Sequence, residues 1–233
     1  MGSLPALETL ERRELWEWVH ESLRDAIIAG ELEFNTRLVE DEIAARLGVS
    51  RWPVRQAIIR LEQERLVIRH PHRGAFVNPL STKEVHQIYS LRVLLETFAI
   101  KEGASQITPE FVASQHQLLI DNVEAALNRD YLLYSKLDTE FHRNIIDLAK
   151  SDRLLDLWTQ LLPAIQVLQV LGAKNDPNPS QGIRDRHTPI LQALETSDPL
   201  RIEEALRQHL SESEARALRI CSGLEQTKTQ SLT

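Results

Sequence analysis

Cysteine is almost absent from this 233-residue chain, in which Cys221 stands alone. A single cysteine excludes an internal disulfide framework and a cysteine-based zinc finger, and it favours a reducing compartment. The chain has no run of about 18 apolar residues, the length that a membrane span requires. Its first residues, MGSLPALETLERREL, lack the basic-then-apolar order of a signal peptide. We therefore expect a soluble, cytoplasmic protein with no membrane partner.

Lysine is missing from the first third of the chain, and all six lysines follow residue 80. The formal net charge of −7 argues weakly against nonspecific binding to nucleic acid. That average conceals a basic patch at residues 46–73, which contains seven arginines and only two acidic residues. The arginines are Arg46, Arg51, Arg55, Arg60, Arg65, Arg69 and Arg73, and the acids are Glu62 and Glu64. The planar guanidinium can bond phosphate and guanine edges bidentately, so this patch points to nucleic acid.

The pattern within the patch predicts a short helical domain that ends in a hairpin. Residues 10–29 and 40–47 have helical spacing, and Gly48 breaks the second helix. Ser50 is expected to cap the next helix, and Pro53 is tolerated in its first turn. That helix buries Val54, Ala57, Ile58 and Leu61. Two apolar stretches, LVIR and AFVN, then flank the turn HPHRG.

This order of elements is that of a winged helix-turn-helix, in which the third helix enters the major groove and the wing reaches the backbone or minor groove. The opposite face of the helix presents residues at its amino end, where they can meet DNA. The expected contacts are Ser50, Arg51, Trp52, Arg55 and Gln56, with Arg73 and Gly74 placing the wing. The alternative is a small helical domain with a solvated arginine face.

The remainder of the chain is expected to be an antiparallel all-α bundle of about six helices, which makes the protein mainly α. The pattern predicts helices at 82–104, 109–128, 130–150, 152–172 with a kink at Pro163, 182–196 and 199–220. Ser81 and Glu84 form a capping box at the start of the first. We predict a DNA-binding domain at residues 10–78, a helical domain at 79–222, and a flexible tail at 223–233.

A carboxylate and three histidines of the bundle are candidates for a metal site. Asp138 and His142 are four residues apart, so they share one helix face about 6 Å apart along the axis. His187 and His209 lie on helical patterns beside apolar positions that face the core. Four such ligands can hold a divalent ion such as zinc or nickel. From spacing alone, satisfied core histidines explain them better.

The motif LVEDEIAARLGVSRWPVRQAIIRLEQERLVIRHPHRGAFV closely resembles the DNA-binding domain of GntR-family bacterial transcription regulators. The segments LRVLLETFAI, DTEFHRNIIDLA and RHTPILQALETSDPLRIEEALRQHL are similar to the ligand-binding (FCD) domain of the FadR-like subfamily. The resemblance covers about residues 12–220. It implies a homodimer that binds a short inverted repeat of double-stranded DNA, with an effector pocket inside the bundle.

The resemblance also assigns roles within the bundle. It implies that Asp138, His142, His187 and His209 hold a divalent metal ion, most often zinc, with nickel or another transition metal as alternatives. It further implies that Arg92 meets the carboxylate of a small organic acid. The alternative for Arg92 is an ion pair with Glu96, one helical turn away.

Three positions depart from the family pattern. Relatives usually carry threonine where Trp52 stands, glutamate at Gln56 and glycine at Arg65. Trp52 and Gln56 lie on the expected DNA face, so operator preference cannot be copied from relatives. If Arg65 adopts a left-handed conformation, the side chain costs roughly 1 kcal/mol; otherwise the helix ends slightly differently.

We therefore expect a metabolite-responsive transcription regulator, most often a repressor in this subfamily, and no catalysis. Two alternatives stay open at this point. One is a metal-dependent hydrolase or lyase built on the bundle, for which no residue is an obvious general base. The other is a regulator whose metal is purely structural or absent.

Overall fold

The computed structural model describes residues 10–230, with side chains over residues 15–223, and it is mainly α as predicted. The chain divides into two compact units between Pro79 and Leu80. No single helix in residues 10–230 is long and apolar enough to cross a membrane. The helices Asp152–Thr159 and Leu162–Lys174, which are bent by 52° at the break between them, pass that test only as a pair.

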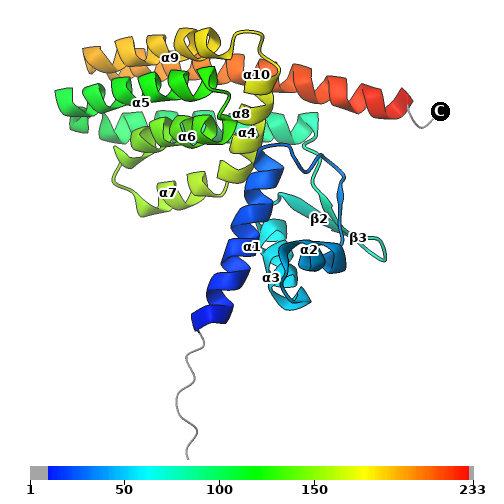
Figure 1. Ribbon diagram of the computed structural model, residues 1–233. Helices are drawn as coiled ribbons and strands as arrows, with labels where there is room; N and C mark the ends of the chain where they lie inside the picture. The colour runs from blue at the N-terminus through cyan, green and yellow to red at the C-terminus, as the bar shows by residue number, and fades with distance from the viewer. Residues whose placement is uncertain (1–9, 231–233) are drawn as a thin grey trace, which may run out of the picture. The chain divides into compact units, whose positions relative to one another are not determined.

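The first unit is a small helical core with a three-stranded sheet (Figure 1). Its elements are α1 (Leu10–Ile28), β1 (Arg37–Leu38), α2 (Glu40–Leu47), α3 (Arg51–Gln63), β2 (Val67–His70) and β3 (Gly74–Val77). Helix α1 packs along α3, and Val19 of α1 and Val54 of α3 are fully buried there. Each side chain buried in this way contributes about 1.5–3 kcal/mol to the stability of the unit.

The sheet has the order β1-β3-β2, with both pairs antiparallel. Val67 pairs with Val77 and His70 with Gly74, which places residues 71–73 at the tip of the hairpin. The amide of Arg73 donates to the carbonyl of His70 at 3.1 Å, and His72 has φ of 60°. Pro71 in the second position and a positive φ in the third are the features of a type II turn. The short segment between α1 and α2 supplies the additional strand β1.

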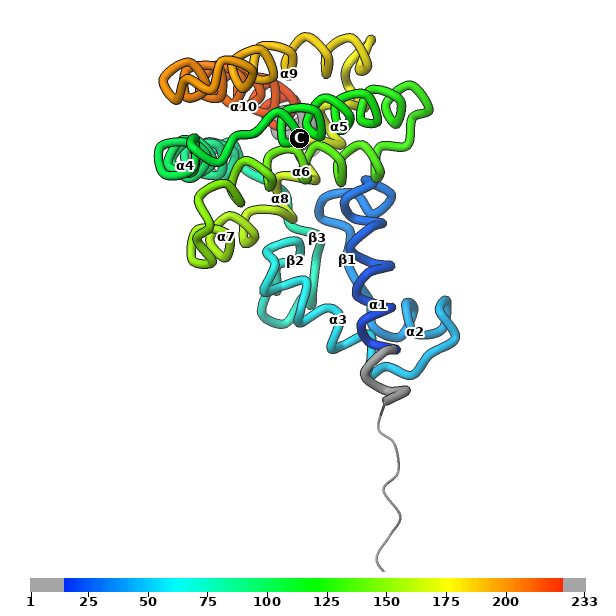
Figure 2. Tube along the Cα trace, turned by 90° about the vertical axis from the view of Figure 1, so that its left-hand side faces the viewer, coloured from blue at the N-terminus to red at the C-terminus, as the bar shows by residue number. Residues whose placement is uncertain are grey.

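The second unit is a bundle of helices (Figures 1 and 2). Its elements are α4 (Thr82–Gly103), the short 3-10 helix η1 (Ala104–Gln106), α5 (Pro109–Leu127), α6 (Tyr131–Asp147), α7 (Asp152–Thr159), α8 (Leu162–Lys174), α9 (Pro179–Thr196) and α10 (Pro199–Gln230). The predicted capping box of Ser81 and Glu84 starts α4. Helix α6 packs against α4, α5, α7 and α8, which makes it the central element of the unit.

Three details of the bundle differ from the sequence prediction. The segment predicted as one kinked helix at 152–172 is two helices, because the ring of Pro163 would clash with the carbonyl of Thr159, where α7 ends. Residues 80–230 therefore hold seven α-helices rather than six. Helix α9 begins at Pro179, three residues before the predicted start. Helix α10 continues to Gln230, although a tail was predicted from residue 223, because Gly223 alone does not end the helix.

Candidate functional site

The amino end of α3 carries the residues predicted to contact DNA. Ser50 holds the N-cap position with extended backbone, but its side chain makes no capping hydrogen bond, so that part of the prediction was wrong. Pro53 is buried in the first turn, as the sequence indicated. Trp52 is 53% exposed, and Gln56 is half-buried. A large indole thus stands on the outer surface of this helix beside the two arginines.

Both arginines of this face form ion pairs with acids of α2, and these pairs were not predicted from the sequence. Arg55 donates to Glu40 Oε2 from Nε at 3.1 Å and from Nη2 at 2.9 Å. Arg51 Nε lies 3.0 Å from Asp41 Oδ1. The Arg55 hydrogen bond and charge hold the pKa of Glu40 below its usual value. The Arg51 and Arg55 side chains stay more than half exposed, so these ion pairs are weak and can give way to phosphate.

The tip of the hairpin holds the other two residues of the predicted DNA contact. Arg73 is exposed, and its guanidinium lies 5.7 Å from the centroid of the Phe76 ring. Gly74 has φ of 97°, a conformation that other residues rarely adopt. The glycine therefore allows the wing to turn back into β3 directly after Arg73.

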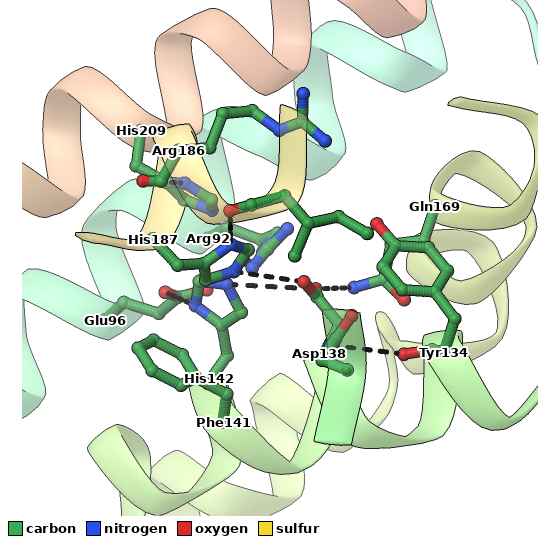
Figure 3. Close-up of polar contacts among 12 residues, drawn as sticks. Arg92, Glu96, Tyr134, Asp138, Phe141, His142, Gln169, Arg186, His187 and His209 are labelled. Atoms are coloured by element: carbon green, nitrogen blue, oxygen red, sulfur yellow. Dashed lines mark hydrogen bonds and ion pairs between the residues drawn. The ribbon is translucent and has the colours of Figure 1, made fainter. Parts of the chain in front are cut away.

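The four candidate metal ligands come together in the bundle (Figure 3). Asp138 and His142 extend from α6, His187 from α9 and His209 from α10, and each is at most 5% exposed. One ring nitrogen of each histidine lies within 4.8 Å of the corresponding atoms of the other two. A single ion can therefore contact all three imidazoles.

In each of the three imidazoles, Nδ1 lies against a hydrogen-bond acceptor, and this contact directs Nε2 toward the centre of the cluster. Nδ1 of His142 lies 2.7 Å from Glu96 Oε2, Nδ1 of His187 lies 3.0 Å from the carbonyl of Ile183, and Nδ1 of His209 lies 3.2 Å from the carbonyl of Arg186. All three partners are acceptors, so each Nδ1 carries the hydrogen. Each Nε2 then has a free lone pair, which is the tautomer that a metal requires.

Asp138 completes the cluster from the side. Its Oδ1 lies 3.0 Å from His187 Nε2 and its Oδ2 lies 3.9 Å from His142 Nε2. Burial raises the pKa of Asp138, but the nearby imidazoles, His187 foremost, hold it well below its usual value. Burial, together with His187 and His142, lowers the pKa of His209. Asp138 is thus held as a carboxylate and His209 as a neutral imidazole, the protonation states in which these two groups bind a cation.

Two buried nitrogens of the cluster, His142 Nε2 and His187 Nε2, have no hydrogen-bond partner. Lone pairs that face one another and a carboxylate in a buried space repel unless a cation lies between them. The residues present therefore fit a divalent metal ion, and the donor set of three nitrogens and one oxygen suits zinc or nickel.

Arg92 lies beside this cluster, on α4, and is 2% exposed. Its Nε donates to Glu96 Oε1 at 2.8 Å, so the ion pair considered as an alternative is present. Its Nη2 is buried and has no hydrogen-bond partner. The guanidinium also lies 5.6 Å from the centroid of the Tyr89 ring. The ion pair thus occupies one edge of Arg92 and leaves a second donor for another anion.

Further polar residues line this region, and they were not predicted from the sequence. Gln169 of α8 donates from Nε2 to Asp138 Oδ2, and its Oε1 is buried without a partner. Trp158 of α7 is fully buried and donates from Nε1 to Glu96 Oε1 at 3.4 Å. The sequence contained a signal that does not single out Gln169, because two glutamines, Gln166 and Gln169, interrupt the otherwise apolar segment LPAIQVLQVL.

Comparison with known proteins gives a consistent result over both units. The family model described as bacterial regulatory proteins, gntR family, matches residues 15–77, and the FCD domain model matches residues 87–212. The gluconate operon transcriptional repressor of Bacillus subtilis is 30% identical over 195 residues, which cover 82% of this chain and 79% of that protein. The transcriptional repressor RspR of Escherichia coli is 29% identical over 195 residues, covering 83% and 85%.

A solved structure from Rhodococcus sp. RHA1, described as a GntR transcriptional regulator, superimposes with a TM-score of 0.73 at 25% identity. The match covers 88% of this chain and 98% of that chain.

Proposed function

Since the chain belongs to the GntR family of bacterial regulatory proteins and is a DNA-binding transcription regulator with an FCD domain, we propose that it is a metabolite-responsive repressor. It acts in the cytoplasm as a homodimer on an inverted-repeat operator, and a small organic acid binds in its metal-containing pocket. The observation that carries the effector is the buried, unpartnered Nη2 of Arg92 beside a cluster of metal ligands. Relatives named as repressors support the direction of control.

The operator contact is the amino end of α3. Arg51 and Arg55 bind phosphate or guanine edges, and Arg73 reaches the adjacent backbone or minor groove from the wing. To reach DNA, Arg55 exchanges the carboxylate of Glu40 for phosphate, at little cost because the Arg55 side chain is more than half exposed. Trp52 packs on sugar or on a thymine methyl group, which gives this chain an operator preference of its own.

A stripe of exposed apolar side chains on α4 supports the homodimer. Leu91, Leu94 and Phe98 follow helical spacing and are 45%, 62% and 48% exposed. A two-fold axis across this stripe would bring it against its own copy, which is the self-complementary arrangement of a two-fold dimer. Two α3 helices related by that axis match the two halves of an inverted repeat.

The metal, zinc or nickel, is held by Asp138, His142, His187 and His209. When bound, it supplies a positive charge for the carboxylate of the acid. Arg92 Nη2 donates to the same acid, and Gln169 Oε1 accepts from a hydroxyl group on it. The Bacillus relative is named for the operon of gluconate, itself a small organic acid, which supports an acid effector.

Effector binding changes operator affinity only if the acid prefers one arrangement of the dimer. A purely structural metal is the second candidate, since four protein ligands can close a site. The orphaned donor of Arg92 and the orphaned acceptor of Gln169 favour the effector, because a structural ion leaves both without partners.

The experiment that tests the proposal uses DNA that the full-length protein retains from its own genome. We expect the retained sites to share an inverted repeat, and a panel of small carboxylic acids to contain one that releases the protein in a gel shift. That acid should also raise the melting temperature of metal-loaded protein and lose this effect once the metal is stripped. An acid that acts equally on stripped and loaded protein would contradict the metal-containing pocket.

A further inference from the structure

Glu96 lies behind the metal ligands, on α4, and is completely buried. Its two oxygens receive three hydrogen bonds from three different helices. Oε1 accepts from Arg92 Nε at 2.8 Å and from Trp158 Nε1 at 3.4 Å, and Oε2 accepts from His142 Nδ1 at 2.7 Å. Figure 3 shows Glu96 beside His142, on the side of the ring away from Asp138.

We propose that Glu96 is a positioning residue for the metal site: its carboxylate fixes His142 in the Nδ1-protonated tautomer and aims Nε2 at the ion. This inference rests on the metal site proposed above. Among the three imidazoles, His142 alone has a side-chain acceptor on Nδ1, since His187 and His209 use backbone carbonyls. The orientation of His142 therefore depends on one side chain that can be exchanged.

The neighbours of Glu96 keep it in the form that the role requires. The guanidinium of Arg92 donates to Oε1 at 2.8 Å, and this positive charge favours the carboxylate form of the buried acid. Arg92 and Trp158 occupy Oε1 together, so Oε2 is left for His142. A carboxylate on the remote nitrogen of a histidine ligand also makes the ligating nitrogen more basic.

Glutamine cannot replace Glu96 in this arrangement, because the site needs two acceptors and an amide has one. If the amide oxygen serves Arg92, the NH2 group faces His142 Nδ1 and forces the hydrogen of that ring onto Nε2. If the oxygen serves His142, the NH2 group opposes the N–H groups of Arg92 and Trp158. Glu96→Gln therefore either removes the lone pair that binds the metal or leaves buried donors facing each other.

The test compares the Zn²⁺ affinity of full-length wild type, Glu96→Gln and Glu102→Gln in competition with a chelator. Glu102 is exposed on the same helix, so its substitution makes the same change of charge without touching the cluster. Loss of a residue that orients a metal ligand typically weakens affinity by about 10- to 100-fold. We expect that loss for Glu96→Gln, and a change of less than threefold for Glu102→Gln. Equal affinities of Glu96→Gln and wild type would overturn the proposal.

A second measurement uses metal-free wild type and remains decisive if Glu96→Gln does not fold. Long-range ¹H–¹⁵N spectra of histidine-labelled protein report which ring nitrogen carries the hydrogen, and His142→Gln identifies the signal. We expect the Nδ1–H tautomer for His142, and an Nε2–H tautomer would refute the role of Glu96. Wild type that binds no Zn²⁺ while His142 keeps the Nδ1–H tautomer would instead contradict the proposed metal site.

Discussion

The end of α3 provides a quantitative prediction, because Arg65 adopts a conformation that suits glycine. Its φ is 59°, and the helix ends with two hydrogen bonds of a Schellman motif. The amide of Arg65 donates to the carbonyl of Glu62 at 3.1 Å, and the amide of Leu66 donates to the carbonyl of Leu61 at 3.0 Å. We predict that Arg65→Gly raises the free energy of unfolding of the first unit.

The magnitude follows from two opposing terms. A left-handed conformation costs a residue with a Cβ atom roughly 1–2 kcal/mol. Glycine recovers that cost but loses about 0.4–1 kcal/mol through the greater freedom of its unfolded chain. The hydrogen bond that Asn78 Nδ2 donates to the carbonyl of residue 65 at 2.8 Å involves only backbone at that position, so glycine keeps it. The net gain is about 0.5–1 kcal/mol, which for a unit of this size corresponds to roughly 2–8 °C in melting temperature.

Calorimetry of the full-length protein measures this gain. The transition of the first unit is identified as the one that added Zn²⁺ does not shift. Arg46→Gly is the matched control, because Arg46 lies within α2 and glycine is less favourable there by up to about 1 kcal/mol. A melting temperature that stays the same or falls in Arg65→Gly, while Arg46→Gly is destabilised, would refute the reasoning about the left-handed conformation.

Three further predictions concern the proposed functions. Arg55→Ala should abolish operator binding in a gel shift while the melting temperature and the dimer are unchanged, since the side chain is exposed. If the variant kept its operator affinity, the proposal that α3 contacts the operator would be wrong. His187→Ala should lower the bound Zn²⁺ of untagged protein, measured by elemental analysis, from about one equivalent to well below half, because three ligands remain; a wild type below half an equivalent, unaffected by the substitution, would disprove the metal site. Leu94→Asp should convert the dimer to a monomer in analytical ultracentrifugation, because it places a charge in the apolar stripe of α4, and Leu200→Asp, at another exposed leucine, is the control that should stay dimeric. A dimeric Leu94→Asp protein would place the interface elsewhere.

Local patterns were sufficient to predict most of the elements. Proline, glycine and the apolar spacing define where α3 begins and where the hairpin turns, because these residues act on the backbone within a few positions. The pairing of Asp138 with His142 follows from a helical turn in the same way. The joining of this pair with His187 and His209 did not follow from spacing, and only the family resemblance indicated it.

Contacts between helices distant in the sequence could not be predicted, since they depend on how the elements pack. His142 meets Glu96 across a separation of 46 residues, and Arg55 meets Glu40 across 15. Nothing in the local sequence distinguishes Glu96 from a solvated acid of an amphipathic helix. For this reason the sequence indicated that Glu96 pairs with Arg92, which is four residues away on the same helix. It did not indicate that Glu96 also contacts His142.

Helix α4 connects the proposed pocket with the proposed dimer interface. Its inner face carries Arg92 and Glu96, while Leu91 and Leu94 lie on its exposed side. An acid that binds Arg92 therefore acts on the helix that would pack against the second subunit. Because a helix shifts as a unit, a small displacement at Arg92 reaches the stripe without a chain of intermediate contacts. Glu96 contacts both Arg92 and His142, so it connects the proposed metal site to the same helix. We therefore expect that metal and acid are required together to change operator affinity.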